Sequence, residues 1–180
     1  MRTFRYLALL SVLLLLVACQ PIVRPAEGAG TAMQQVANTP SGQDEAALHE
    51  ENKAVMRRFL ETTWNERSTA AIDELLTPDA AIIGSDMSVG NPASVKLFAA
   101  AFLAGFSDFH MEIQEQIAEG DVVVTRWLVT GTHDGEFIGI LPTGNQIELA
   151  GMTWTHHVDG KIDKAIDAYD MMVLMGQLGL

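Results

Sequence analysis

The sequence predicts an α+β domain, in which helices come first and antiparallel strands follow. Apolar residues recur at three- and four-residue spacings up to about Leu103, whereas beyond Gly105 they alternate with polar ones. The chain of 180 residues, once an N-terminal leader is subtracted, is long enough for one domain with a core but not for two. We therefore expect a single domain with a curved, cone-shaped sheet that packs against the helices and encloses a pocket.

Residues 1–18 predict a signal peptide. Arg2 and Arg5 precede an apolar run that is too short to span a bilayer of about 30 Å as a stable helix. The run ends in Leu-Val-Ala-Cys at residues 16–19, which resembles the lipobox of bacterial lipoproteins. This resemblance implies lipid attachment at Cys19, export, and anchoring on the extracytoplasmic face of a membrane. Gln20 is not the aspartate associated with inner-membrane retention, so the outer membrane is favoured where the cell has one. The alternative is an ordinary secreted protein with a chance cysteine.

Residues 19–42 predict a flexible tether between this anchor and a folded domain at residues 43–180. The segment contains three prolines and three glycines and shows no sustained apolar period.

The formal net charge is −12, which disfavours binding to nucleic acid because an acidic surface repels phosphates. Cys19 is the only cysteine, and this excludes an intramolecular disulfide and a cysteine nucleophile within the domain.

Three helices are expected in the first half of the domain. Residues 43–64 place apolar side chains on one face of a helix, and a short second helix is expected at residues 70–76, before Thr77-Pro78. Asn91-Pro92 has the N-cap and first-turn proline of a third helix, which extends to about Leu103.

Four antiparallel strands are expected in the second half, at residues 110–119, 122–132, 146–158 and 161–170. Gly120-Asp121 and Asp159-Gly160 supply the turns of two hairpins. Residues 171–180 can form a terminal helix.

The last expected strand carries the candidate catalytic residue. Strict alternation places Asp167 on one face between Ala165 and Tyr169, together with Lys161 and Asp163. Desolvation in a pocket raises a carboxyl pKa and suits it to general acid–base work. The alternative is a solvated carboxylate on the strand surface. Asp170 has a second interpretation of its own, as the N-cap of the terminal helix.

The other polar and aromatic candidates have competing interpretations. His156 and His157 are adjacent on a strand, so their rings point to opposite faces unless a bulge intervenes. Because no metal-ligand spacing links the histidines, we expect no metal site. His133 is either a loop residue or a residue at a pocket mouth, and Arg126 is expected to pair with a carboxylate. The three tryptophans, Trp64, Trp127 and Trp154, serve either as core or as a ligand platform.

Residues 126–144, RWLVTGTHDGEFIGILPTG, resemble the SnoaL-like family of polyketide cyclases and the related ester cyclases, within the nuclear-transport-factor-like superfamily. Further matching pieces are Phe-Ser-Asp-Phe-His at residues 106–110, Asp-Gly-Lys-Ile at 159–162, Tyr169-Asp170, and Gln-Leu-Gly at 177–179. The resemblance covers about residues 45–180 and agrees with the expected order of helices and strands.

The resemblance implies ring closure by intramolecular aldol condensation, with an aspartate as acid and base and no metal, cofactor or covalent intermediate. That aspartate corresponds to Asp167, the family's second aspartate to Asp170, and a histidine of the glycine-rich motif to His133. Thr153 stands where the polyketide enzymes have a pocket histidine, and Ile82 stands in place of an asparagine. These two departures weaken the inference of polyketide cyclisation itself.

We therefore expect a membrane-anchored domain that binds a small apolar carbonyl compound. Asp167 would act as acid and base in a cyclisation or isomerisation, and the substrate would be bound by His133, Asp170, Tyr169, Trp64 and Trp154. One alternative is a non-catalytic ligand-binding or interaction lipoprotein of the same fold, and another is hydrolysis or dehydration on the same scaffold. Because an open sheet face in this family commonly pairs, we also expect a homodimer.

Overall fold

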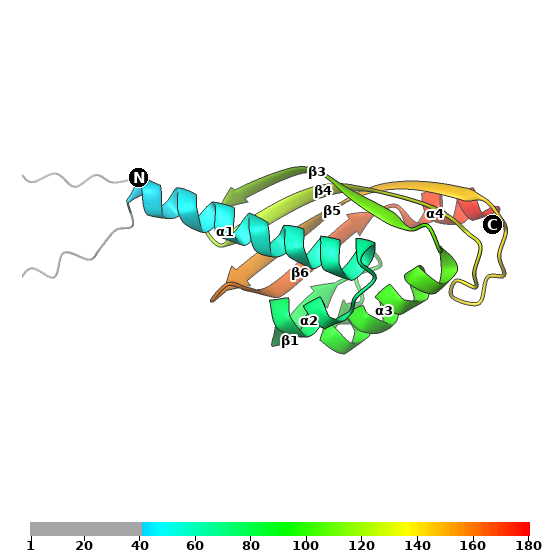
Figure 1. Ribbon diagram of the computed structural model, residues 1–180, viewed down its shortest axis with the longest axis horizontal. Coiled ribbons are helices and arrows are strands. Elements are labelled where there is room, and N and C mark those ends of the chain that lie inside the picture. The colour runs from blue at the N-terminus through cyan, green and yellow to red at the C-terminus, as the bar shows by residue number, and fades with distance from the viewer. Residues whose placement is uncertain (1–40) are drawn as a thin grey trace, which may run out of the picture. The chain divides into compact units, whose positions relative to one another are not determined.

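Helices and a single six-stranded sheet make up residues 41–180, the part of the chain that this computed structural model describes (Figure 1). The helical segments are α1 (Gly42–Leu60), η1 (Glu61–Asn65), α2 (Ala70–Leu75), α3 (Pro92–Gly105) and α4 (Met171–Leu178). The strands are β1 (Leu76–Ile83), β2 (Val89–Gly90), β3 (His110–Glu119), β4 (Val122–Thr132), β5 (Gln146–Val158) and β6 (Lys161–Tyr169). The predicted α+β class is confirmed.

The predicted signal peptide, Cys19 and the tether up to residue 40 lie outside the described residues. The last two residues assigned to the tether are described, and they form the start of α1. Ser41 is the N-cap, since its Oγ accepts from the Asp44 N–H while the Asp44 carboxylate accepts from the Ser41 N–H. No helix within residues 41–180 is long and apolar enough to cross a membrane.

The first expected helix is divided into two kinds of helix. Regular α-helix ends at Leu60, and residues Glu61–Asn65 continue as a π-helical turn. The wider turn leaves Thr63 and Trp64 buried. Single π turns occur frequently at functional sites, and this one carries Trp64 to the inner side of the helical layer.

The sheet differs from the prediction at one edge. Its order is β2-β1-β6-β5-β4-β3, and β1 pairs in parallel with β6 through Ile82 and Ala165. Neither β1 nor the two-residue β2 was among the expected strands, and α2 ends one residue before its predicted end. Thr77-Pro78 has the composition of a turn, which concealed β1. The proline is accommodated since it falls in an irregular stretch of the ladder between Leu76 and Ala81.

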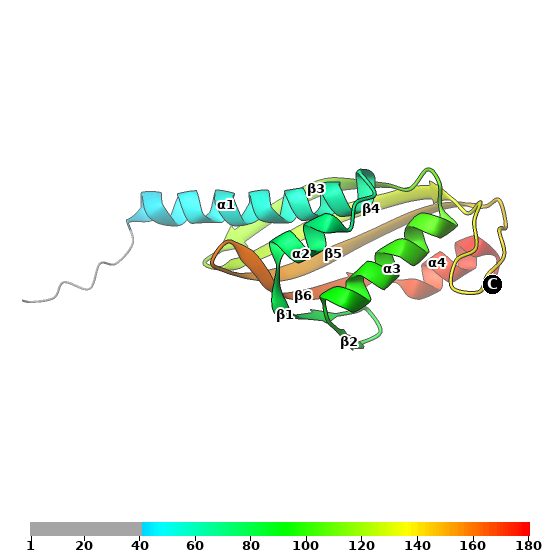
Figure 2. The ribbon, with the colours of Figure 1, turned by 60° about the horizontal axis from the view of Figure 1, so that its bottom comes forward.

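The helices cover one face of the sheet, as the turned view shows (Figure 2). Residues from both layers form the core, among them Met56 and Leu60 of α1, Phe102 of α3, and Trp127 of β4. In β4 and β5 the buried positions alternate, so that Thr125, Trp127 and Val129 face the helices together with Thr153 and Thr155. The space between these inner side chains and the helices is where a ligand can be held.

Candidate functional site

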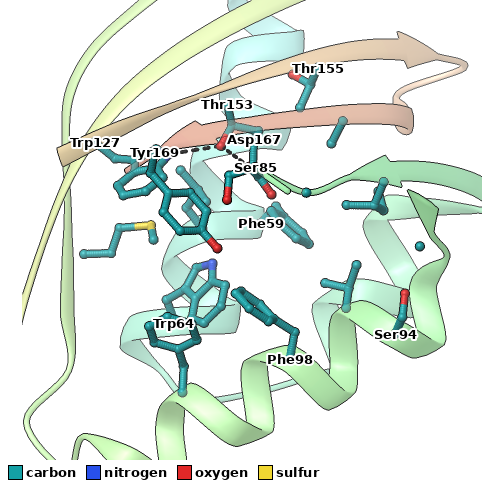
Figure 3. Close-up of a pocket in the computed structure, with 18 of the residues that line it drawn as sticks. Phe59, Trp64, Ser85, Ser94, Phe98, Trp127, Thr153, Thr155, Asp167 and Tyr169 are labelled. Carbon is teal, nitrogen blue, oxygen red and sulfur yellow. Dashed lines mark hydrogen bonds between the residues drawn. The ribbon is translucent and has the colours of Figure 1, made fainter. Parts of the chain in front are cut away.

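A cavity of about 470 Å³ lies between the helical layer and the inner face of the sheet (Figure 3). Its walls are mainly aromatic and aliphatic, and the aromatic side chains are Phe59, Trp64, Phe98, Phe102, Phe109, Trp127 and Tyr169. The polar groups at its wall come from Thr153, Thr155 and Asp167 of the sheet, Ser94 of α3, and the β1–β2 loop. A cavity of this size and character suits a small, largely apolar ligand that is oriented by a few polar contacts.

A bulge in β6 brings Asp167 into this cavity. His156 pairs with Lys164 and His157 with Ile162, so Asp163 is an extra residue in β6. Ile162 and Ala165 therefore line the cavity with Asp167 and Tyr169. The prediction that Lys161 and Asp163 share the face of Asp167 was wrong, because it assumed strict alternation through the strand. Asp163 instead lies 2.6 Å from His156 Nδ1, measured from its Oδ1.

The carboxyl group of Asp167 faces the cavity and not bulk solvent. Asp167 is only partly accessible to solvent, and Figure 3 shows its side chain directed into the cavity. Thr153 Oγ1 donates to Asp167 Oδ1 at 2.7 Å, and Trp127 Nε1 donates to Thr153 Oγ1 at 2.9 Å. Burial raises the pKa of Asp167, while the hydrogen bond from Thr153 acts in the opposite direction. The result is a titratable carboxyl group in an apolar setting.

Tyr169 and Trp64, two of the predicted binding residues, also line the cavity. In Figure 3 the Tyr169 hydroxyl and the Trp64 indole nitrogen point toward one another across the space below Asp167. Burial raises the pKa of Tyr169, with the Ser85 hydroxyl opposing the shift. Tyr169 is therefore an O–H donor over the physiological pH range, and Trp64 supplies an N–H donor.

His133 does not line the cavity, although it was predicted to bind the substrate. Its ring is fully buried beside Phe106 and Phe137, with centroids at 5.3 and 6.5 Å. His133 Nδ1 accepts from the Thr143 N–H at 3.3 Å and lies 3.1 Å from Thr143 Oγ1. These contacts join the two ends of the 133–145 loop, which is a structural role.

Asp170 and Trp154 also lie away from the cavity wall. Asp170 is the N-cap of α4, and its Oδ1 accepts from the N–H groups of Met172 and Val173 at 2.9 and 3.2 Å. Trp154 has the opposite parity to Thr153 on β5, so its ring lies on the outer face of the sheet. There it stacks on His156 at 6.4 Å and lies beneath Lys164 Nζ. Strand alternation therefore rules out a contact between Trp154 and a ligand in this cavity.

The remaining polar candidates are distributed over other parts of the domain. His156 is half-exposed on the outer face, whereas His157 is buried on the inner face, where its Nε2 lies 3.0 Å from Thr155 Oγ1. Arg126 lies 3.7 Å from Glu115 on the outer face. Within residues 41–180 no group of three or more histidine, cysteine or acidic side chains has the arrangement of a metal site.

The comparisons with known proteins agree with this geometry. A sequence model of the family described as SnoaL-like polyketide cyclase matches residues 54–178. The chain belongs to the SnoaL-like polyketide cyclase family. This SnoaL-like domain therefore combines a cyclase-type fold with a cavity that suits a small molecule. A comparison with curated proteins found no match.

Crystal structures of other SnoaL-like and related proteins share the fold. AclR from Streptomyces galilaeus, described there as a proposed hydroxylase, is 28% identical with a TM-score of 0.67, over 73% of this chain and 82% of AclR. IdmH from Streptomyces antibioticus, described as a proposed polyketide cyclase, is 25% identical with a TM-score of 0.64, over 72% of this chain and 99% of IdmH. A Jannaschia protein is 23% identical with a TM-score of 0.69, over 76% and 97% of the two chains, and shows the shared fold alone.

Several cavity residues of this SnoaL-like domain were missed or undervalued in the sequence. Trp127 was weighed mainly as core, and Thr153 only as a departure from the family's histidine. The pairing of Thr153 with Asp167 had no local signal, because the turn at Asp159-Gly160 alone would set Asp167 opposite Met152, and the bulge at Asp163 shifts it opposite Thr153. Ser85 and Asp86 also line the cavity, and their position had no signal in the sequence, because the loop that carries them follows the unexpected strand β1.

Proposed function

We propose that this domain binds a small, largely apolar carbonyl compound and that Asp167 transfers protons during its cyclisation or isomerisation. The observation that carries the proposal is the carboxyl group of Asp167, which faces an apolar cavity of about 470 Å³ and has its pKa raised by burial. Burial disfavours the ionised form, which makes the carboxylate a stronger base than an aspartate in water.

In the proposed reaction, ionised Asp167 removes a proton from a carbon next to a carbonyl group. The electron pair of the broken C–H bond moves to the carbonyl oxygen and forms an enolate. The hydroxyl of Tyr169 and the indole N–H of Trp64 are donors at the cavity wall that can stabilise this oxygen. In isomerisation, protonated Asp167 returns the proton to another carbon.

In cyclisation, the enolate carbon forms a C–C bond to a second carbonyl group of the same molecule. The oxygen of that carbonyl then receives the proton from Asp167, so the carboxylate is regenerated and no other reactant is consumed. The aromatic walls hold the two reacting parts of the compound together, which replaces an encounter in solution by an intramolecular step.

The test measures exchange of α-protons for deuterium in a panel of bicyclic aromatic ketones such as 1-tetralone. Wild-type protein should catalyse exchange with at least one ketone, and Asp167→Asn should lower the rate by about 100-fold or more. The asparagine is close in size to the aspartate, so the variant should still bind the ketone, as a thermal shift can measure. Equal exchange rates in the two proteins would refute the assignment of Asp167.

A non-catalytic binding protein is the second candidate. One observation favours it: His133 and Asp170, which were expected to assist Asp167, lie outside the cavity. Wild-type protein that binds ketones but exchanges no α-proton would support this function over catalysis.

We also propose that the domain is exported and held at a membrane by lipid on Cys19. The sequence of residues 16–19 after an apolar run supports this location. Metabolic labelling with a radioactive fatty acid should label the wild-type chain but not Cys19→Ser. Labelling of both chains would contradict the anchor and leave the cavity chemistry unaffected.

A further inference from the structure

Two hydrogen bonds in series connect three neighbouring strands at the wall of the cavity. Trp127 of β4, Thr153 of β5 and Asp167 of β6 are joined by contacts of 2.9 and 2.7 Å, drawn as dashed lines in Figure 3. Thr153 and Asp167 are direct partners in the antiparallel ladder. The side chains of Trp127 and Thr153 are buried, each with 5% exposure.

The direction of both hydrogen bonds is fixed by chemistry. An indole N–H can only donate, so Thr153 Oγ1 accepts from Trp127. The single proton of the Thr153 hydroxyl is then directed at Asp167 Oδ1. A proton on Oδ1 would lie against this hydroxyl proton and repel it, so Oδ1 remains an acceptor. Oδ2 has no hydrogen-bond partner among the described residues.

We propose that Thr153, oriented by Trp127, is the positioning residue of this site, and that it fixes Asp167 Oδ1 as an acceptor and leaves Oδ2 as the atom that takes and returns protons. The role of Oδ2 in turnover rests on the proposed function, whereas the fixing of Oδ1 does not. Thr153 thereby orients the carboxyl group of Asp167 through a neutral hydroxyl. No second titratable side chain is needed to orient it.

The surroundings of Asp167 leave this hydrogen bond with few competitors. Of the described residues that line the cavity, the titratable ones are Asp86, Asp167 and Tyr169, and no lysine, arginine or histidine is among them. Asp86 accepts from the Ser88 N–H in the β1–β2 loop, and Tyr169 is neutral below its raised pKa. The Thr153 hydroxyl is therefore the main protein group that stabilises the ionised form of Asp167 against burial.

The experiment is a titration of aspartate side-chain carboxyl groups by carbon-13 NMR in the full chain. The signal of Asp167 is assigned by its loss in Asp167→Asn. Thr153→Val removes the hydroxyl and keeps the shape of the side chain, and it should raise the Asp167 midpoint by about one pH unit or more. Thr153→Ser retains the hydroxyl and should restore a midpoint close to the wild-type value.

Thr155→Val is the matched control. Thr155 lies two residues away on the same face, but its hydroxyl donates to the Val123 carbonyl oxygen at 3.2 Å and not to Asp167. This substitution should leave the Asp167 midpoint unchanged. If Thr153→Val does not fold, Trp127→Phe provides a second route, since it frees the Thr153 hydroxyl to rotate and should also raise the midpoint.

Two outcomes would overturn the positioning role of Thr153. One is the same Asp167 midpoint in Thr153→Val and wild type, and the other is an equal shift in Thr155→Val, which would indicate a general effect of lost polarity. The titration needs no turnover, so its result is independent of whether ketones exchange protons. Where exchange is observed, its pH profile should move with the midpoint in Thr153→Val and return in Thr153→Ser.

Discussion

The indole ring of Trp127 occupies the space that a β-carbon on Gly151 would need. A methyl group built on Gly151 would lie 2.3 Å from Cη2 of Trp127 and 2.4 Å from Cζ2. The two residues are partners across β4 and β5. Glycine at this position therefore lets the ring lie against the β5 backbone, from where its N–H reaches Thr153.

Gly151→Ala should displace the ring and break the hydrogen bond from Trp127 to Thr153. We expect a loss of roughly 1–3 kcal/mol in the free energy of unfolding, as is typical of overpacking. Urea unfolding monitored by tryptophan fluorescence measures it. Gly176→Ala is the control, because a β-carbon there meets nothing within 4 Å and alanine favours the helix. Unchanged stability in Gly151→Ala would show that the ring moves aside without cost.

Asp167→Asn should stabilise the domain at neutral pH. A raised pKa means that the folded state binds the proton of Asp167 more tightly than the unfolded state does. The contribution of this carboxyl group to the free energy of unfolding is therefore fully present below its ordinary pKa of 3.8. It is lost as the pH rises through the pKa of Asp167 in the folded state. We expect a gain of roughly 0.5–2 kcal/mol at pH 7, the usual range for a stabilising substitution.

Thermal unfolding of both proteins from pH 3 to pH 8 checks this expectation. The difference in Tm should shrink toward pH 3, where the wild-type carboxyl group is protonated in both states. A difference that is independent of pH would mean that the asparagine acts through packing and not through charge.

His157 should lower stability in weak acid. Burial depresses its pKa from 6.5 to about 4, with His156 adding to the effect. The unfolded chain therefore binds a proton between pH 6.5 and about 4 that the folded chain does not, and stability falls as the pH drops through this window. His157→Gln should flatten the fall relative to its own stability at pH 7.5. Parallel pH profiles for the two proteins would contradict the depressed pKa.

Asp170→Ala should cost about 1 kcal/mol of stability, the usual effect of removing an N-cap. Its carboxylate accepts from two backbone N–H groups at the start of α4 and does not line the cavity. Asp170→Ser should retain most of the stability, because serine also caps helices. Binding of 1-tetralone, measured by thermal shift, should be the same in both variants and wild type. Weaker binding in both would give Asp170 a role in the cavity after all.

Ala165→Leu should fill part of the cavity beside Asp167. Ala165 is buried, lines the cavity, and lies two residues before Asp167 on β6. Its side chain faces open space within the cavity, so we expect the fold to be retained. The apparent affinity for 1-tetralone, derived from its thermal shift, should fall at least tenfold. Undiminished binding would place the ketone elsewhere on the domain.

Local sequence determined most of the secondary structure. The strands β3, β4 and β5 have the predicted bounds, since alternation and glycine turns act over a few residues. Asn91 and Pro92 start α3 as expected, because an N-cap needs only its own side chain and the N–H of Ser94. The resemblance in residues 126–144 indicated the family, and the shared Asp-Gly-Lys-Ile at residues 159–162 matched Asp167 to the family's aspartate.

Tertiary contacts decided which of the candidate side chains meet. The bulge at Asp163 depends on pairing with His156 and His157, so counting by twos along β6 could not find it. His133 faces Phe106 because the chain that follows α3 lies beside it, and β1 forms only because β6 supplies a neighbour for a stretch that contains Thr77-Pro78. The hydrogen bonds from Trp127 through Thr153 to Asp167 cross three strands, and their geometry exists only when all three lie side by side.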